Sequence, residues 1–272
     1  MTSRQITGRV AFLAVVAAFV VSLYRLELLD PSVVWPALQR LGEFVTELFP
    51  PNWDVTRTLL GAMGETLQIA FAGTLLGFLF SLPLAILATR TLFGGTVTTA
   101  ARLVMGAVRT VPSLLWGVIF VIGFGLGPAA GALGVALYTV GYMGKLLYEA
   151  FEAADAEVVE AVRSVSANRL QLFAFAVLPE SANALISQLL FMFEYNIRAS
   201  SIMGFVGAGG IGYYMLGYIQ LLQYENLMTA LIITFVVVMA IDYLSVRLRS
   251  LILSPSPASA PSPFAGLVPS VG

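Results

Sequence analysis

Six apolar stretches dominate this chain, and their length limits the folds that it can adopt. A helix needs about 20 apolar residues to cross the roughly 30 Å of hydrocarbon in a bilayer. The stretches occupy residues 10–23, 66–88, 103–124, 129–148, 182–205 and 227–244. Lipid offers no partners to open backbone polar groups, so spanning segments of this kind form helices. The sequence therefore predicts an all-α integral membrane protein with about six transmembrane helices.

The composition supports this prediction and excludes several classes of function. Hydrophobic residues make up 58% of the chain and charged residues 11%, with a formal net charge of −1. Soluble domains carry roughly 25% charged residues, so this chain has too few polar side chains to cover a water-facing surface. Cysteine and histidine are absent, which excludes disulfides, thiolate nucleophiles, His-based triads and the common zinc and haem ligand sets. No basic run is present, so nucleic-acid binding is not expected.

Residues 1–25 are predicted to form an N-terminal membrane anchor. Arg4 and Arg9 come before or beside a short apolar stretch, as basic residues do in a secretory signal peptide. No small-x-small cleavage site follows, because Leu23, Tyr24 and Arg25 come next. We therefore favour a retained helix over a cleaved signal peptide.

The distribution of basic residues favours an orientation with both termini in the cytoplasm. Placing the N-terminus inside puts ten of the 14 basic residues in cytoplasmic segments. These ten are Arg4, Arg9, Arg90, Arg102, Arg109, Lys145, Arg163, Arg169, Arg247 and Arg249. The chain is thus expected to be a multi-pass protein of the plasma (cell inner) membrane.

Two segments differ from the membrane-like core, which is predicted to cover residues 65–250. Residues 26–64 contain four prolines and scattered charges, and are predicted to form an external loop with a short surface helix. Residues 251–272 have the Pro/Ser-rich composition of a disordered extension.

The longest polar stretch on the predicted cytoplasmic side covers residues 149–169, and good helix formers dominate its first part. Its apolar residues recur with helical spacing and predict a stripe along one face. These residues are Val158, Ala161, Val162 and Val165, and the acidic residues of the other face are Glu152, Asp155, Glu157 and Glu160. Such a helix lies either on its own bundle or against a soluble partner.

Residues 160–167 and 176–179 resemble the EAA loop of ABC importer permeases, the inner-membrane components of binding-protein-dependent transport. The family pattern is Glu-Ala-Ala-x3-Gly, a spacer and Ile-x-Leu-Pro, and this chain departs from it at Val162, Ser166 and Ala176. The resemblance implies a type I ABC importer permease fold, in which loop 149–169 is a coupling helix held in a groove of an ATPase subunit. The coupling residues that it implies are Glu157, Glu160, Ala161, Arg163, Ser166 and Ala167.

Further segments look like the phosphonate-uptake branch of these permeases. They are residues 65–67, 73–77, 82–85, 109–116, 144–146, 193–199 and 206–212. This resemblance implies a translocation pathway for phosphonate or a related phosphorus oxyanion, phosphite or phosphate. The implied partners are a second copy of the chain, ABC ATPase subunits and an extracytoplasmic substrate-binding protein. ATP and Mg would be used by the ATPase, while this chain would bind no cofactor and perform no covalent chemistry.

Charged residues inside apolar segments are candidate pathway residues, because an ionised side chain at the bilayer centre costs about 2.5–3.5 kcal/mol on insertion scales. Glu194 and Arg198 lie four residues apart and share a helix face. They form either a self-neutralising packing pair or a pathway site, with Arg198 attracting a phosphoryl group beside Tyr195 and Asn196. Two further sets of charges are predicted to form local pairs. These are Asp242 with Arg247 and Lys145 with Glu149.

A glycine cluster over residues 204–212 contains a literal G-x-G-x-x-G pattern. It follows an apolar helix rather than a strand, so it fails as a dinucleotide fingerprint. No Walker-type G-x4-G-K-[ST] motif is present, so the chain itself is not expected to bind ATP. Gly207, Gly209, Gly210 and Gly212 are predicted to form either a gate with an anion-attracting nest or a tight interhelical turn.

Three rival functions remain open at this stage. The same architecture could import methionine or another small solute. An intramembrane lipid enzyme is disfavoured, because no His, Cys or clustered carboxylate pair is available. An ion-driven carrier would be expected to show internal inverted repeats, and none is visible.

Overall fold

The structure is a computed structural model that describes residues 3–252, and every regular element in that range is helical. The elements are α1 (Ser3–Arg25), α2 (Pro31–Glu47), η1 (Trp53–Val55), α3 (Thr56–Ala88), α4 (Gly95–Thr110), α5 (Ser113–Phe124), α6 (Pro128–Glu152), α7 (Ala156–Ser164), α8 (Arg169–Leu172), η2 (Phe173–Val177), α9 (Leu178–Met203), η3 (Gly204–Val206), α10 (Gly210–Gln220) and α11 (Tyr224–Ile252). The predicted all-α class is confirmed. Almost all of the predicted tail, residues 251–272, lies outside the described residues.

Within the described residues, four helical segments are long and apolar enough to cross a membrane. They are Trp53–Ala88, Pro128–Glu152, Arg169–Val206 and Tyr224–Leu251, and each contains one of the predicted spans. A fifth span is counted if the bent pair α4 and α5 crosses as one unit. In α1 only Ala11–Arg25 is apolar, which is shorter than these spans. The structure therefore has four or five such spans, fewer than the predicted six.

The predicted span over residues 103–124 is not one continuous helix. It contains the end of α4 and all of α5, and the two axes meet at 84°. Pro112 lies at the break and Val111 before it is extended, with φ −84° and ψ 123°. Proline donates no backbone hydrogen bond and disfavours helical geometry in the residue before it. The predicted span over residues 103–124 is therefore divided at Pro112, where α4 ends and the chain turns.

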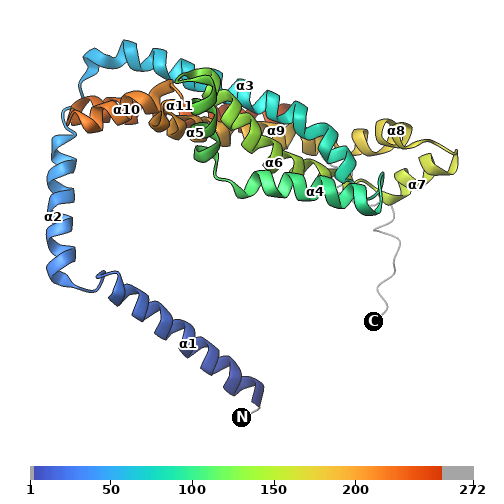
Figure 1. The fold of residues 1–272 in the computed structure, drawn as a ribbon, viewed down its shortest axis with the longest axis horizontal. Coiled ribbons are helices and arrows are strands. Elements are labelled where there is room, and N and C mark those ends of the chain that lie inside the picture. Colours follow the sequence, from blue (N-terminus) through green and yellow to red (C-terminus); the bar gives the residue numbers. More distant parts are fainter. Residues whose placement is uncertain (1–2, 253–272) are drawn as a thin grey trace, which may run out of the picture.

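The centre of the molecule is a bundle in which α3, α4, α6 and α9 run side by side (Figure 1). The axes of α3 and α6 approach closely because small residues face each other. A Cβ atom at Gly73 would lie 2.5 Å from Cγ1 of Val135, closer than real Cβ atoms pack. The helix pair therefore depends on this glycine.

Two apolar clusters fill opposite ends of the bundle. One surrounds Met143, Leu147 and Phe151 at the end where α7 and α8 project (Figure 1). The other surrounds Leu59 and Ile211 at the end where α10 lies. We refer to these as the α7 end and the α10 end. The outer surfaces of the spans expose large apolar side chains such as Leu79, Phe80, Leu103 and Phe235, as lipid contact requires.

The helices α1 and α2 extend away from the bundle (Figure 1). Asp30 begins α2 by accepting a hydrogen bond from the Ser32 backbone N–H at 2.8 Å, and Pro31 occupies the first turn. Both features favour a helix start. This helix occupies part of the segment for which a short surface helix was predicted. By contrast α10, which follows the glycine cluster, was not predicted as a helix.

Candidate functional site

The polar loop between α6 and α9 folds into two short helices joined by a tight turn. Asp155 caps α7 by accepting a hydrogen bond from the Glu157 backbone N–H at 2.8 Å, and Asn168 begins α8 in a reciprocal capping box with Gln171. Ser166 lies between them with φ 62°. This left-handed conformation favours glycine, which is the residue that the EAA pattern has here. Ser166 adopts the turn that glycine would make at lower cost.

The inner face of α7 differs from the predicted stripe. Val159 is buried, and Val158 and Val162 pack partly buried against the apolar cluster of the α7 end. Ala161 and Val165 are exposed, so only part of the predicted stripe faces the bundle. The helix ends at Ser164, which leaves Val165 outside the regular face.

The six predicted coupling residues lie on the outer surface of this loop. Glu157, Glu160, Ala161, Arg163 and Ser166 are exposed, and Ala167 is half-buried. Arg163 also reaches across to the α3–α4 turn and donates to the Thr91 carbonyl oxygen at 3.3 Å. The outer face of the loop is therefore available to another molecule, while its inner face is fixed to the bundle.

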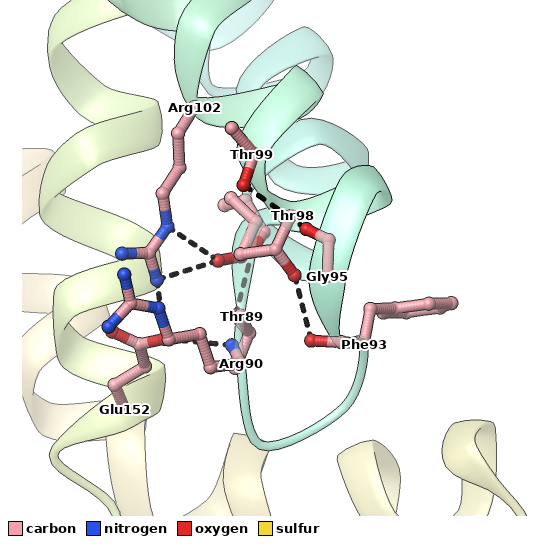
Figure 2. Close-up of polar contacts among 10 residues, drawn as sticks. Thr89, Arg90, Phe93, Gly95, Thr98, Thr99, Arg102 and Glu152 are labelled. Carbon is pink, nitrogen blue, oxygen red and sulfur yellow. Dashed lines mark hydrogen bonds and ion pairs between the residues drawn. The ribbon is translucent and has the colours of Figure 1, made fainter.

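A hydrogen-bonded network beneath α7 joins three elements (Figure 2). Arg102 of α4 donates to the Ala88 carbonyl oxygen at 3.0 and 2.8 Å and pairs with the Glu152 carboxylate at 2.5 Å. Glu152 also accepts the Arg90 backbone N–H at 2.7 Å. Glu152 thus belongs to the end of α6 and to this network, not to the polar face of the loop helix as predicted. Sequence periodicity could not find the pair, because its partners lie 50 residues apart.

An open groove of about 460 Å³ separates α7 from the α3–α4 turn. Its lining includes Arg90, Glu152, Val159, Glu160 and Arg163. Charges of both signs surround an apolar floor, which suits contact with a protein side chain better than binding of a small apolar molecule.

The charges of α9 pair with α11 rather than with each other. Arg198 makes a bidentate contact with Asp242 at 2.9 and 2.8 Å, and Glu194 pairs with Arg249 at 3.0 Å. The predicted Glu194–Arg198 pair is therefore wrong, as is the predicted Asp242–Arg247 pair. Both predictions considered only neighbours on one helix, whereas packing against α11 supplied opposite charges. The local pair predicted for Lys145 and Glu149 is confirmed, with a distance of 3.4 Å.

The neighbouring Asn196 is fully buried inside the bundle. Its amide nitrogen donates to the Thr74 hydroxyl at 2.8 Å and to the Thr139 hydroxyl at 2.9 Å. These bonds tie α9 to α3 and α6. The structure therefore places Asn196 in helix packing, away from any exposed surface where a passing solute could contact it.

Tyr195 lies on a different face and is 37% exposed. Its ring stacks on Tyr138 and Tyr142 of α6, with centroid distances of 5.9 and 6.2 Å. Its hydroxyl lies 3.2 Å from that of Tyr138. Of the four predicted pathway residues, Tyr195 is thus part of a half-exposed polar cluster, whereas the charges of Glu194 and Arg198 are neutralised by α11.

The glycine cluster forms a tight turn between α9 and α10. Gly207 has φ 83° and Gly209 has φ 81°. The backbone N–H groups of Gly210 and Ile211 donate to Glu65 and Thr66 of α3, at 3.0 and 2.8 Å. A carboxylate of the chain itself thus occupies the Gly210 amide of the predicted nest.

Close packing at Gly212 supports the alternative reading of an interhelical turn. A Cβ atom at Gly212 would overlap the carbonyl oxygen of Ser201. The four predicted glycines, Gly207, Gly209, Gly210 and Gly212, therefore lie together in the tightly packed turn between α9 and α10.

Together these features define a multi-helix membrane protein with a projecting polar loop. Several apolar helices form a bundle, the charges inside it are mostly paired, and a polar helical loop projects from one end with its outer face free.

A family model for the binding-protein-dependent transport system inner membrane component matches residues 81–253. The phosphite transport system permease protein PtxC of Stutzerimonas stutzeri is 35% identical over 223 residues, which cover 82% of this chain and 81% of that protein. The phosphate-import permease protein PhnE of Mycolicibacterium smegmatis is 38% identical over 75% of this chain and 39% of that protein. This chain belongs to the family of binding-protein-dependent transport system inner membrane components.

Solved structures agree on the fold. An inward-facing MetNI methionine ABC transporter chain aligns with a TM-score of 0.65 at 20% identity, covering 75% of this chain and all of that one. The predicted type I permease fold is confirmed. The chain is a multi-pass membrane permease component rather than an enzyme, as the sequence predicted.

Proposed function

We propose that this chain forms the translocation pathway of an ATP-driven importer for a phosphorus oxyanion. Two copies would enclose the pathway between them, and each α7 would engage one ATPase subunit in the cytoplasm. The α7 end would then face the cytoplasm and the α10 end would receive ligand from an extracytoplasmic binding protein. ATP and Mg would be bound by the ATPase alone.

One observation carries the proposal. The loop helix α7 offers exposed Glu157, Glu160 and Arg163 to a partner, while Val159 on its opposite side is buried in the bundle. A push on such a helix is transmitted, because packed cores and ion-pair networks move as rigid units. The Arg102–Glu152 network passes this motion to α4 and α6.

The substrate class is inferred from relatives. Proteins named for phosphite and phosphate transport align with three quarters or more of this chain. A shared phosphorus oxyanion is the chemistry common to these names. We therefore propose phosphonate, phosphite or phosphate as the imported solute.

Co-purification with a tagged candidate ATPase tests the coupling. Glu160→Lys reverses a charge on the exposed face of α7, and we expect it to lower ATPase retention at least tenfold, an energy of about 1.4 kcal/mol. Glu43→Lys on α2 is the matched control, because Glu43 is exposed far from α7. Retention unchanged by Glu160→Lys would contradict the coupling assignment.

Uptake by proteoliposomes containing the full complex tests the substrate. Labelled phosphate, phosphite and methylphosphonate would be compared with methionine, each delivered by its candidate binding protein. ATP-dependent uptake of at least one phosphorus oxyanion is expected. Uptake of methionine alone would replace the proposed substrate and leave the fold and coupling unchanged.

A further inference from the structure

Three tyrosines form a stacked cluster near the middle of the bundle. Tyr138 and Tyr142 project from α6 with their centroids 5.9 Å apart, and Tyr195 of α9 stacks on both. All three side chains are only partly buried, and the hydroxyls of Tyr138 and Tyr195 lie 3.2 Å apart. Tyrosine hydroxyls both donate and accept hydrogen bonds. The cluster therefore presents neutral polar groups on a partly exposed face of α6 and α9.

Arg109 lies beside this cluster at the end of α4. On α6, Gly141 directly precedes Tyr142, and a Cβ atom at Gly141 would lie 2.8 Å from the Arg109 backbone nitrogen. The missing side chain thus lets the end of α4 approach α6 next to this tyrosine.

Arg109 differs from three other arginines of the bundle. Arg102, Arg198 and Arg249 each pair with a carboxylate. Over residues 3–252, Arg109 forms neither an ion pair nor a side-chain hydrogen bond, and it is exposed. An arginine in a transmembrane segment is costly unless it faces water or an anion. The exposed guanidinium of Arg109 is therefore available to water or to an anion.

The helix break adds to the local positive potential. After Arg109 the chain turns by 84°, and α5 begins at Ser113 without a side-chain cap. The first backbone N–H groups of a helix carry partial positive charge and face outward from its end. Residues 109–113 thus contain the Arg109 guanidinium and the uncapped start of α5.

We propose that Arg109 and the hydroxyls of Tyr138, Tyr142 and Tyr195 form a transient oxyanion site on the translocation surface. The planar guanidinium can donate to two oxygens of a tetrahedral phosphorus oxyanion, and the hydroxyls can donate to the remaining ones. One positive charge and neutral hydroxyls hold the anion weakly, which permits release. This assignment rests on the proposed function, and it replaces Arg198, whose charge Asp242 neutralises.

The test measures solute imported per ATP hydrolysed, in proteoliposomes with the full complex. Wild-type uptake of phosphate, phosphite or methylphosphonate is established first, and its failure would count against the proposed function alone. Arg109→Gln is then expected to lower the transport ratio at least tenfold while the binding protein still stimulates hydrolysis. Arg109→Lys should have a transport ratio between those of wild type and Arg109→Gln, because lysine keeps the positive charge but lacks the planar pair of guanidinium donors. Arg57→Gln, at an exposed position outside the cluster, should leave the ratio unchanged.

Tyr195→Phe supplies the second variant, because it keeps the stacked ring and removes one donor. We expect a threefold to fivefold fall in the transport ratio with normal assembly, about 0.6–1 kcal/mol. The proposal is overturned if Arg109→Gln and Tyr195→Phe keep the wild-type ratio. It is also overturned if they reduce uptake and hydrolysis equally, since that indicates a structural role.

A lipid headgroup offers the same phosphate chemistry, so the assay is repeated in two bilayers. One contains phosphatidylcholine alone and the other contains added phosphatidylglycerol. The Arg109→Gln effect is expected to be equal in both. An effect that appears only with the anionic lipid would assign Arg109 to headgroup binding and overturn the solute site.

Discussion

The α7 end and the α10 end of the bundle are held together by different means. At the α7 end, side-chain charges link α4, α6 and the α3–α4 turn, and an exposed helix stands above them. At the α10 end, backbone N–H groups bond to Glu65 and Thr66, and glycines bring helices into direct contact. Hydrogen-bonded charges and packed side chains hold the α7 end, whereas direct backbone contacts hold the α10 end. We expect the α7 end to receive the motion and the α10 end to be the stiff one.

The largest effect is expected at the stiff end. Gly212→Ala places a methyl group on the Ser201 carbonyl oxygen, so helices α9 and α10 must separate. We expect the free energy of unfolding in detergent to fall by about 3 kcal/mol, as overpacking does. Thermal unfolding followed by tryptophan fluorescence measures this. Gly217→Ala in the same helix is the control, because open space surrounds Gly217 and alanine favours helix by about 1 kcal/mol. Equal melting temperatures for the two variants would refute the close packing.

A smaller effect on stability, with a larger one on coupling, is expected at the α7 end. Glu152→Ala leaves Arg102 and the Arg90 backbone N–H without their acceptor. We expect a loss of about 2 kcal/mol in stability and a marked fall in transport-coupled ATP hydrolysis. The control is Glu149→Ala, because its pair with Lys145 is half-exposed and longer, at 3.4 Å, and such pairs contribute under about 1 kcal/mol. If both variants behave alike, the network does not transmit motion.

The ion pair between Arg198 of α9 and Asp242 of α11 lies between the two ends. We expect it to contribute less to stability than the contacts at either end. A double-mutant cycle of Arg198→Gln and Asp242→Asn measures their coupling energy in thermal unfolding. Because both side chains are more than a third exposed in the single chain, we expect about 1 kcal/mol or less. The double variant should import solute nearly as well as wild type. A large loss of uptake in that variant would support the original assignment of Arg198 as a pathway residue.

The smallest effect is expected outside both ends, at the start of α2. Hydrogen bonds from the Ser32 side chain and backbone N–H lower the pKa of Asp30 below its usual value. A lowered pKa means that the cap contributes fully above the ordinary aspartate pKa and is lost as pH falls through the lower value. A peptide of residues 26–49 should lose helicity over that acid range by circular dichroism. Asp30→Asn should flatten the profile, since its amide caps without titrating. A profile that Asn does not flatten would assign the transition to another acidic residue.

The sequence predicted best where chemistry is local. Apolar length predicted six spans, and four of them are long apolar helices in the described residues. The polar run 149–169 was predicted to hold a helix, and it is a helical loop whose predicted coupling residues lie on the surface, with Ala167 half-buried. The Lys145–Glu149 pair was predicted because four residues separate neighbours on one helix face. Pro112 ends α4 for an equally local reason, although residues 103–124 were predicted as one span.

Contacts between distant segments could not be predicted in this way. Glu194 and Arg198 share a face of α9, and both find stronger partners on α11. Asn196 resembles a pathway residue in sequence, yet it bonds to Thr74 and Thr139 inside the bundle. Nothing in the spacing along the chain indicates which helix will lie opposite a given side chain.

The sequence by itself thus determined that this is a membrane protein, that it is helical and where its polar loop lies along the chain. Hydrophobic length and helix capping depend on residues close together in the sequence. The tertiary structure alone decided which charges are neutralised, that the Gly210 amide is already bonded to Glu65, and that the end of α4 with Arg109 lies against α6 at Gly141. The physical reason is that ion pairs and hydrogen bonds act over a few ångströms. Only the packing of helices brings residues far apart in the chain within that reach.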